Sequence, residues 1–227
     1  IATLGPASDG AASRLVQAGA TALRVNASHL EPAEVAAIAR KVRDQLPLTP
    51  LVIDLQGAKM RLGRFPTRSV RPGDPVFFAL HPDGASDVPL PHPELFRQIR
   101  RGDTLAIDDG RVPLAVAEVG EQRLSARALE GGMLQSRKGV NVSEHPIVPE
   151  DLTPGDQAVC GLLAGVSGVE WAISFVADGS ELGWVRERAG GAPVIAKIER
   201  PEAMANLPAI AARADRLWVC RGDLGAQ

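Results

Sequence analysis

The stretch that decides the fold of this chain is residues 194–225, VIAKIERPEAMANLPAIAARADRLWVCRGDLG. It begins as a short apolar strand, continues as a helix opened by Pro201 and ends in a second apolar strand. Each strand stops at charged residues, Lys197 and Glu199 after the first and Asp223 after the second. Because side chains two apart on a strand share a face, Lys197 and Glu199 point the same way. The pattern predicts a β-α-β unit with a polar site at its strand ends.

The same alternation of apolar strands and amphipathic helices runs along both flanks of the chain. It is typical of parallel strands joined by right-handed crossovers. Because no Gly-x-Gly-x-x-Gly turn follows the first strand, a TIM-type (β/α)8 barrel is favoured over a Rossmann sheet. Strands are expected at residues 1–4, 22–25, 51–55, 170–175, 194–198 and 216–219, and helices at 9–19 (capped by Asp9), 32–42, 154–164, 180–188 and 201–214.

The barrel is expected to be incomplete and to carry an inserted domain. About six strands are visible, so a complete barrel of eight needs two more beyond Gln227. Between the third and fourth of the visible strands, the pattern changes to short strands separated by Pro-Gly-Asp, Asp-Asp-Gly and Gly-Glu-Gln turns. We therefore expect an α/β barrel formed by residues 1–63 and 144–227, and an all-β, barrel-like lid domain formed by residues 64–143. The inserted strands are expected at residues 75–80, 104–108, 113–119 and 123–128.

Composition places the chain among ordinary globular proteins of one or two domains. It has 227 residues, of which 45% are hydrophobic, and a formal net charge of −2, so nothing points to nucleic acid. No apolar run reaches the roughly 18 residues of a membrane span. Cys160 and Cys220 lack metal or disulfide spacing, so we expect two buried thiols in a reducing, cytoplasmic compartment. The chain begins at Ile1 and stops just after a strand, so we expect further residues at both ends.

Polar and charged residues fall repeatedly at the carboxyl ends of the expected strands, where TIM barrels gather their functional groups. Two carboxylates brought together there can hold a hard divalent cation such as Mg²⁺, with substrate phosphates completing its shell. An ammonium beside that metal suits a reaction in which negative charge builds on an oxygen. The residues are Arg24, Asn26 and Ser28 after the second strand, Asp54 to Arg61 after the third, Lys197 and Glu199 after the fifth, and Arg221 and Asp223 after the sixth.

Seven short motifs follow one another along the chain. They are Thr-Leu-Gly-Pro-Ala-Ser (3–8), Arg-Val-Asn-Ala-Ser-His (24–29), Asp-Leu-Gln-Gly-Ala-Lys-Met-Arg (54–61), Lys-Gly-Val-Asn (138–141), Ser-Phe-Val (174–176), Lys-Ile-Glu (197–199) and Arg-Gly-Asp-Leu-Gly (221–225). In order and spacing they resemble the motifs of the pyruvate kinase family. The resemblance covers essentially the whole chain. It implies a TIM barrel with a β-domain lid and the glycolytic transfer of a phosphoryl group from phosphoenolpyruvate to ADP, giving pyruvate and ATP.

The resemblance also implies roles for individual residues. Lys197 would stabilise the enolate that forms as the phosphoryl group leaves, and Glu199 and Asp223 would hold Mg²⁺ or Mn²⁺. Arg24 would bind the transferring phosphate, assisted by Arg61. Gly222 and Asp223 would lie at the start of a helix, where their backbone N–H groups would bind the substrate carboxylate.

Two further sets follow from the same resemblance. Asn26, Ser28 and Asp54 match the family's monovalent-cation site, and Lys59 resembles the position whose ammonium replaces potassium in potassium-independent members. Potassium is therefore not expected to be required. Lys138, Asp108 and Asp109, with Arg61, match positions that face the nucleotide. The full-length protein is expected to be a homo-oligomer.

The residues also allow other interpretations. Lys197 and Glu199 could form a structural ion pair, Asp223 could be a helix N-cap, and Asp108-Asp109 before Gly110 is a hairpin turn signal. A metal-dependent lyase or aldolase acting through a pyruvate enolate shares this fold and metal chemistry. The third alternative is a non-catalytic sensor of phosphoenolpyruvate or nucleotide. It is motivated by departures from the family pattern at Leu30, Ala58, Ser143-Glu144 and Arg200-Pro201. Three histidines in loop or insert sequence, His81, His92 and His145, are expected on the surface.

Overall fold

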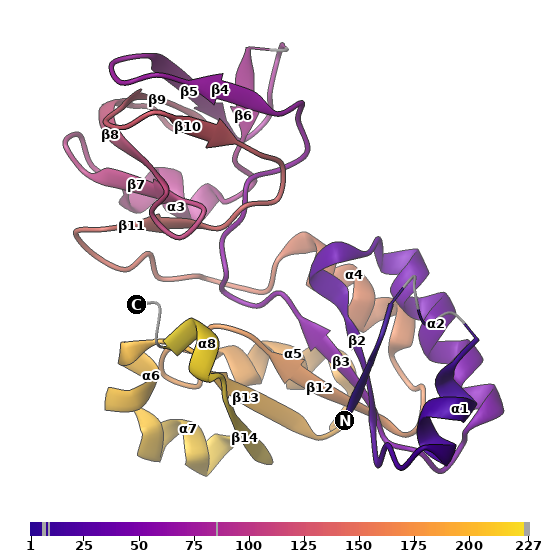
Figure 1. Cartoon of the computed structure of the whole chain (residues 1–227). Coiled ribbons are helices and arrows are strands. Elements are labelled where there is room, and N and C mark those ends of the chain that lie inside the picture. Colours follow the sequence, from indigo (N-terminus) through magenta and orange to yellow (C-terminus); the bar gives the residue numbers. More distant parts are fainter. Residues whose placement is uncertain (6–7, 9, 85, 225–227) are drawn as a thin grey trace. The chain divides into compact units, whose positions relative to one another are not determined.

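The computed structural model describes residues 1–5, 8, 10–84 and 86–224, and of Asp223 the backbone alone. The chain divides into two compact units (Figure 1). The first unit comprises Ile1–Ala58 and Asp151–Gln227, and the second comprises Lys59–Glu150. Asp9, the expected cap of the first helix, lies outside the described residues.

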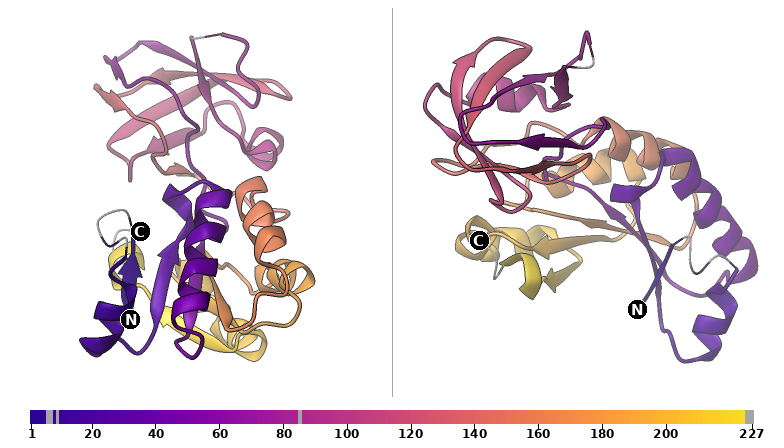
Figure 2. Two further views of the ribbon diagram at one scale, coloured as in Figure 1. Left: turned by 90° about the vertical axis from the view of Figure 1, so that its right-hand side faces the viewer. Right: turned by 45° about the horizontal axis from the view of Figure 1, so that its top comes forward.

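A six-stranded parallel sheet forms the first unit. The spatial order of its strands follows the chain, and β3 pairs directly with β12 because the second unit is inserted between them. Figure 2 shows the helices of this unit on the outside of the curled sheet. The expected incomplete α/β barrel is confirmed. The strands are β1 (Ala2–Leu4), β2 (Leu23–Asn26), β3 (Leu51–Leu55), β12 (Val169–Ile173), β13 (Val194–Ile198) and β14 (Arg216–Val219).

Helices follow each of these strands. Proline stands in the first turn of α2, α4, α6 and α7, where its missing N–H costs no helical hydrogen bond. The single helix expected over residues 201–214 was wrong, because it is interrupted at Asn206 and Pro208 opens a new first turn. The helices are α1 (Ala12–Gln17), α2 (Pro32–Gln45), α4 (Pro154–Leu163), α5 (Glu181–Ala189), α6 (Pro201–Ala205), α7 (Leu207–Arg213) and α8 (Arg221–Leu224), with the 3-10 helix η2 (Ala27–His29) after β2.

The two faces of this sheet carry different cores. The outer face packs against the helices around side chains such as Ile53 and Trp171, both nearly inaccessible to water. On the inner face, Val52, Ala172 and Ile195 form a small separate cluster. Because side chains on one face recur every two residues, the inner-face positions that follow along β3, β12 and β13 are 54, 174 and 197.

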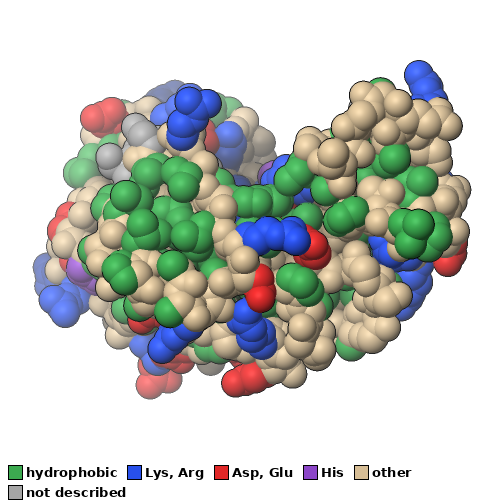
Figure 3. All heavy atoms as spheres, turned by 90° about the horizontal axis from the view of Figure 1, so that it is seen from below, with side chains coloured by type: hydrophobic (Ala, Val, Ile, Leu, Met, Phe, Trp, Pro, Cys, Tyr) green, Lys and Arg blue, Asp and Glu red, His purple; other side chains and the backbone are tan. Residues whose placement is uncertain are grey.

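The sheet ends at β1 on one side and at β14 on the other. Apolar side chains of β14 remain accessible, Leu217 with 37% and Val219 with 64% of its surface exposed. Hydrophobic side chains also gather over this side of the first unit in Figure 3. Among the described residues, β1 and β14 therefore each have one edge without a paired strand.

The second unit is built mainly of antiparallel strands around its own apolar core. The expectation of an all-β domain needs one correction, the short helix α3 (Pro93–Gln98), which buries Leu95 and Phe96. The four expected strands are present, whereas four strands of three residues each were missed because so short a segment shows no alternation. A two-stranded sheet pairs β4 (Arg68–Val70) with β10 (Gly132–Leu134). A six-stranded sheet has the order β11 (Val140–Val142), β7 (Thr104–Ile107), β8 (Val112–Val119), β9 (Arg123–Ala128), β5 (Pro75–Ala79) and β6 (Asp87–Pro89).

The second unit is longer at both ends than residues 64–143. Residues 59–63 belong to it because they pair with the segment before β11: Arg61 forms an isolated bridge with Gly139, and the Val140 N–H donates to the Met60 carbonyl at 3.0 Å. Met60 and, near the other end, Ile147 are buried in its core. Packing therefore places the division closer to β3 and to α4.

No helix among the described residues is long and apolar enough to cross a membrane. Cys160 is buried, and burial raises the pKa of its thiol to about 12. Cys220, which follows β14, is only partly buried, so the expectation of two buried thiols was wrong for this residue.

Candidate active site

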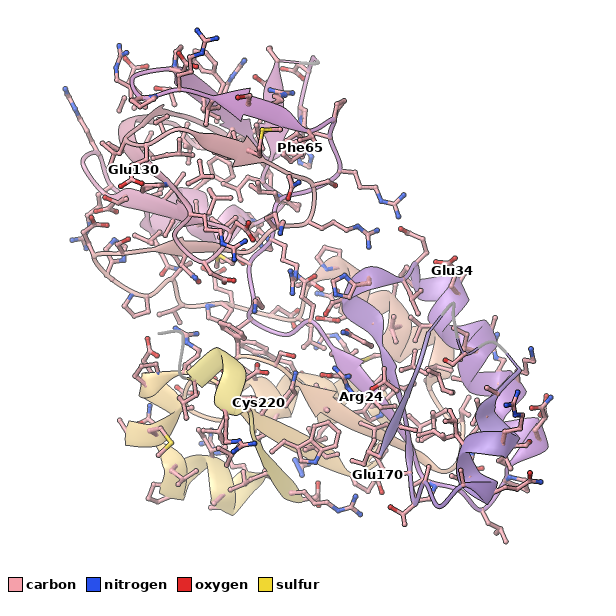
Figure 4. All side chains as sticks on the ribbon, viewed as in Figure 1. Arg24, Glu34, Phe65, Glu130, Glu170 and Cys220 are labelled. Atoms are coloured by element: carbon pink, nitrogen blue, oxygen red, sulfur yellow. The ribbon has the colours of Figure 1, made fainter. Side chains whose placement is uncertain are left out.

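The carboxylate of Asp54 lies at the centre of a buried charge cluster at the carboxyl ends of β2, β3 and β13. Its Oδ2 accepts from Arg24 Nε at 2.8 Å and from Arg24 Nη2, and lies 3.3 Å from Lys197 Nζ. Arg24, labelled in Figure 4, also donates to Thr3 Oγ1 on β1 at 3.0 Å. Two cations therefore converge on one carboxylate that is 1% exposed.

Lys197 is held by three partners. Its ammonium donates to Ser174 Oγ at 2.9 Å and lies 3.0 Å from Glu199 Oε1, in addition to its contact with Asp54. Burial lowers the pKa of Lys197, but the charges of Asp54 and Glu199 outweigh it and leave the pKa above its ordinary value. The site therefore contains an ammonium that is charged at neutral pH and largely shielded from water.

Glu199 is positioned by the backbone that follows β12. Its Oε2 accepts the N–H of Phe175 at 2.9 Å, and the residue is 2% exposed. Phe175 has a φ of 60°, a left-handed conformation that costs a non-glycine residue about 1–3 kcal/mol. The surrounding contacts must supply that energy, and they aim the Phe175 N–H at the carboxylate.

The donor chemistry of Glu199 fits a hard divalent cation. A carboxylate offers about four lone-pair positions, and the structure shows one partner on each oxygen of Glu199. Among the described residues, no three His, Cys, Asp or Glu side chains form a ready metal cluster. The second expected ligand, the carboxylate of Asp223, lies outside the described part of the chain. Its backbone and that of Gly222 lie within α8, which is separated from β14 by Cys220 alone.

Asn26 is the last residue of β2, and Ser28 lies in η2, which follows it. The Asn26 Oδ1 accepts the Ser28 N–H at 3.1 Å and thereby caps η2. Asn26 is paired in register with Asp54 across the β2–β3 ladder. The structure therefore brings the three residues expected at the monovalent-cation site to neighbouring strand ends.

The residues expected to face the nucleotide lie together in the second unit. Lys138 forms an ion pair of 2.9 Å with Asp108, and Arg61 Nη1 donates to the Arg137 carbonyl at 3.0 Å. Asp108 and Asp109 have φ values of 54° and 56° and begin the turn of residues 108–111 that joins β7 to β8. The hairpin turn predicted for this pair is confirmed. Lys59 lies on the segment that contains Arg61, and its Cε would be 3.8 Å from a Cβ at position 139.

His92 is not on the surface, and that expectation was wrong. It is 5% exposed, and its Nε2 lies 2.9 Å from both the N and the O of Arg61. Its Nδ1 lies 3.6 Å from the carboxylate of Glu94. His92 therefore fixes the main chain at Arg61, a contact between residues far apart in the sequence.

A family model for the pyruvate kinase barrel domain matches residues 1–227, the whole chain. The chain belongs to the pyruvate kinase family. It is 37% identical to pyruvate kinase from Methylorubrum extorquens over 241 aligned residues and 32% identical to that from Thermococcus litoralis over 243. Both alignments cover 100% of this chain, with 50% and 51% of the relatives. The crystal structure of pyruvate kinase from Pyrobaculum aerophilum matches all of this chain and 53% of its own, with a TM-score of 0.69 and 26% identity. The chain thus spans about half the length of these relatives.

The sequence predicted no individual role for two residues at or near this pyruvate kinase-type site, Ser174 beside Lys197 and Asp156 beside the turn after β3. Ser174 is the first residue of the Ser-Phe-Val motif (174–176). It lies two residues after Ala172, whose side chain is on the inner face, and this spacing is the signal that could have predicted its contact with Lys197. Asp156 had only a Thr-x-x-Asp pattern that marks the start of a helix. That pattern gives no indication that its carboxylate contacts the turn after β3.

Proposed function

We propose that the full-length protein catalyses transfer of the phosphoryl group of phosphoenolpyruvate to ADP, giving pyruvate and ATP. One observation carries the proposal: the Lys197 ammonium is buried, charged and held by Asp54, Glu199 and Ser174 beside Arg24. Phosphoryl transfer needs positioning and charge neutralisation more than covalent chemistry from the protein. A fixed cation at the strand ends supplies both.

Each residue of the cluster has a chemically matched task. Arg24, whose guanidinium is partly accessible, binds the phosphate of phosphoenolpyruvate. Lys197 stabilises the enolate oxygen as the phosphoryl group leaves. Glu199, with Asp223, would hold Mg²⁺ or Mn²⁺, which when bound neutralises charge on substrate oxygens. Gly222 and Asp223 offer backbone N–H groups to the substrate carboxylate.

The nucleotide is assigned to residues of the second unit. Lys138 and Arg61 provide cations for the phosphates of ADP, and Asp109 lies on the exposed turn beside them. Because Asp108 neutralises Lys138 in the structure, phosphate binding would replace one anionic partner with another.

Potassium should have little effect on turnover, because the ammonium of Lys59 would replace it. Titrating potassium from zero to 100 mM, with a sodium control at equal ionic strength, should change the rate by less than about twofold. The Lys59→Glu variant should become potassium-dependent. A large activation of the unaltered protein by potassium would contradict this assignment.

A coupled assay for pyruvate on the full-length protein tests the main proposal. With phosphoenolpyruvate, ADP and Mg²⁺, we expect turnover that Lys197→Met reduces by about 100- to 1,000-fold or more. Lys41→Met, at an exposed helical position, is the matched control and should leave the rate unchanged. Phosphoenolpyruvate binding without turnover would indicate a sensor, and pyruvate aldol chemistry without ADP would indicate the lyase alternative.

A further inference from the structure

Asp156 is a buried carboxylate outside the charge cluster of the site. It lies in the first turn of α4 and is 3% exposed. Its Oδ1 accepts the Gln56 N–H at 3.0 Å, and its Oδ2 accepts the Gly57 N–H at 2.9 Å. Its own N–H donates to Thr153 Oγ1 at 3.1 Å. Both oxygens of one side chain therefore bind consecutive amides of the turn that ends β3.

The turn at residues 56–58 is also restricted by close packing against Ser174. Gly57 has a φ of 61°, and a Cβ there would lie 2.1 Å from the Ser174 carbonyl oxygen. The next amide, that of Ala58, donates to the same Ser174 oxygen at 3.3 Å. The turn therefore packs directly against the backbone that follows β12.

Ser174 connects this turn with the ammonium of the site. Its hydroxyl accepts from Lys197 Nζ at 2.9 Å and donates to the Leu55 carbonyl at 3.0 Å. Displacement of the turn would therefore move Ser174 and, through it, Lys197. Asp54, which binds the same ammonium, lies only two residues before Gln56.

We propose that Asp156 is a positioning residue, which fixes the turn at residues 56–58 so that Ser174 and Asp54 hold the Lys197 ammonium in place. The inference rests on the proposed function. An ionised carboxylate suits this task because charge-assisted hydrogen bonds to N–H groups are stronger and shorter than neutral ones. It needs no contact with substrate.

The full-length Asp156→Asn variant tests this role, because asparagine keeps the shape but places an amide donor against one N–H. We expect kcat for pyruvate formation to fall about 10- to 100-fold, with KM for phosphoenolpyruvate changed less than threefold, since Lys197 acts on charge that develops during transfer. Hydrogen–deuterium exchange at the amides of Gln56 and Gly57 should accelerate. Asp156→Glu keeps both acceptor oxygens, so its kcat should lie between those of Asp156→Asn and the unaltered protein. It replaces Asp156→Asn in the test if the asparagine variant does not fold.

Glu181→Gln is a matched control. Glu181 is 1% exposed in the first turn of α5, and its carboxylate accepts the N–H groups of Ala177 at 2.7 Å and Gly179 at 3.0 Å. The Glu181→Gln variant should lose about as much thermal stability as Asp156→Asn, yet its kcat should stay within about threefold of that of the unaltered protein.

An unchanged kcat in Asp156→Asn, an equal loss in both variants, or unchanged exchange of the turn would overturn the inference. If the unaltered protein shows no turnover, the proposed function fails. The amide exchange of Gln56 and Gly57 then still decides whether Asp156 holds the turn.

Discussion

At the scale of single residues, the site is dominated by charges removed from water. Asp54, Lys197 and Glu199 are all buried, and their mutual attraction must offset a large desolvation cost. Buried ion pairs of this kind seldom add net stability over an apolar core. Their arrangement is therefore better explained by the proposed chemistry than by stability, since a preorganised cation stabilises developing negative charge.

The pH dependence of stability should show the cost of burying Asp156. Burial raises the pKa of its carboxyl to about 6 from an ordinary 3.8. The folded state thus binds the proton more tightly, so this residue's contribution to stability falls as pH rises from about 4 to 6. By linkage the change is roughly 3 kcal/mol.

Denaturant unfolding of the unaltered protein and of Asp156→Asn between pH 4 and pH 7.5 measures this contribution. The free energy of unfolding of the unaltered protein, minus that of the variant, should decline across the window. Groups whose pKa is lowered, such as Asp178 and Asp215, act in the opposite sense but cancel in the difference. A flat or rising difference would show that folding does not raise the pKa of Asp156.

At the scale of elements, the site depends on the turns that follow the strands. The turn after β3 is bound by Asp156 and packed on Ser174, and the loop after β12 presents the Phe175 N–H to Glu199. The short strands themselves contribute alternation and register. The strands β2, β3 and β13 carry Arg24, Asp54 and Lys197, whereas Ser174 and Glu199 lie in the segments that follow β12 and β13.

Gly57→Ala should be far more damaging than an ordinary glycine substitution. It combines a φ of 61° with a Cβ position 2.1 Å from the Ser174 oxygen, so the turn would have to move. Gly165→Ala is the control, because Gly165 has a φ of 78° but nothing within 4 Å of its Cβ position. We expect a loss of about 1 kcal/mol for Gly165→Ala and of at least about 3 kcal/mol for Gly57→Ala in denaturant unfolding. Equal losses would show that the turn yields without strain.

At the scale of the whole molecule, each of the two units has a large apolar core of its own among the described residues. The core around Ile53 and Trp171 lies entirely within the first unit, and the core around Phe78 and Leu114 lies entirely within the second. Each unit therefore buries its own apolar surface, which is the physical requirement for independent folding.

The segment of residues 59–150 should fold when produced alone. We expect a cooperative thermal transition by circular dichroism and dispersed amide resonances. Phe78→Ala, which removes a side chain with no exposed surface, should lower its stability by about 3–5 kcal/mol. A non-cooperative transition in the unaltered segment would mean that its core needs the first unit.

Sequence patterns alone determined the alternation of strands and helices, the presence of an insertion after the third strand, the hairpin turn at Asp108-Asp109 and the shared face of Lys197 and Glu199. These features depend on local periodicity and turn chemistry, which a sequence displays directly. The tertiary structure alone decided that Asp156 binds the turn after β3, that Ser174 holds Lys197 and that His92 is buried against Arg61. Such contacts depend on which strand ends become neighbours, and that is set by packing across long sequence separations.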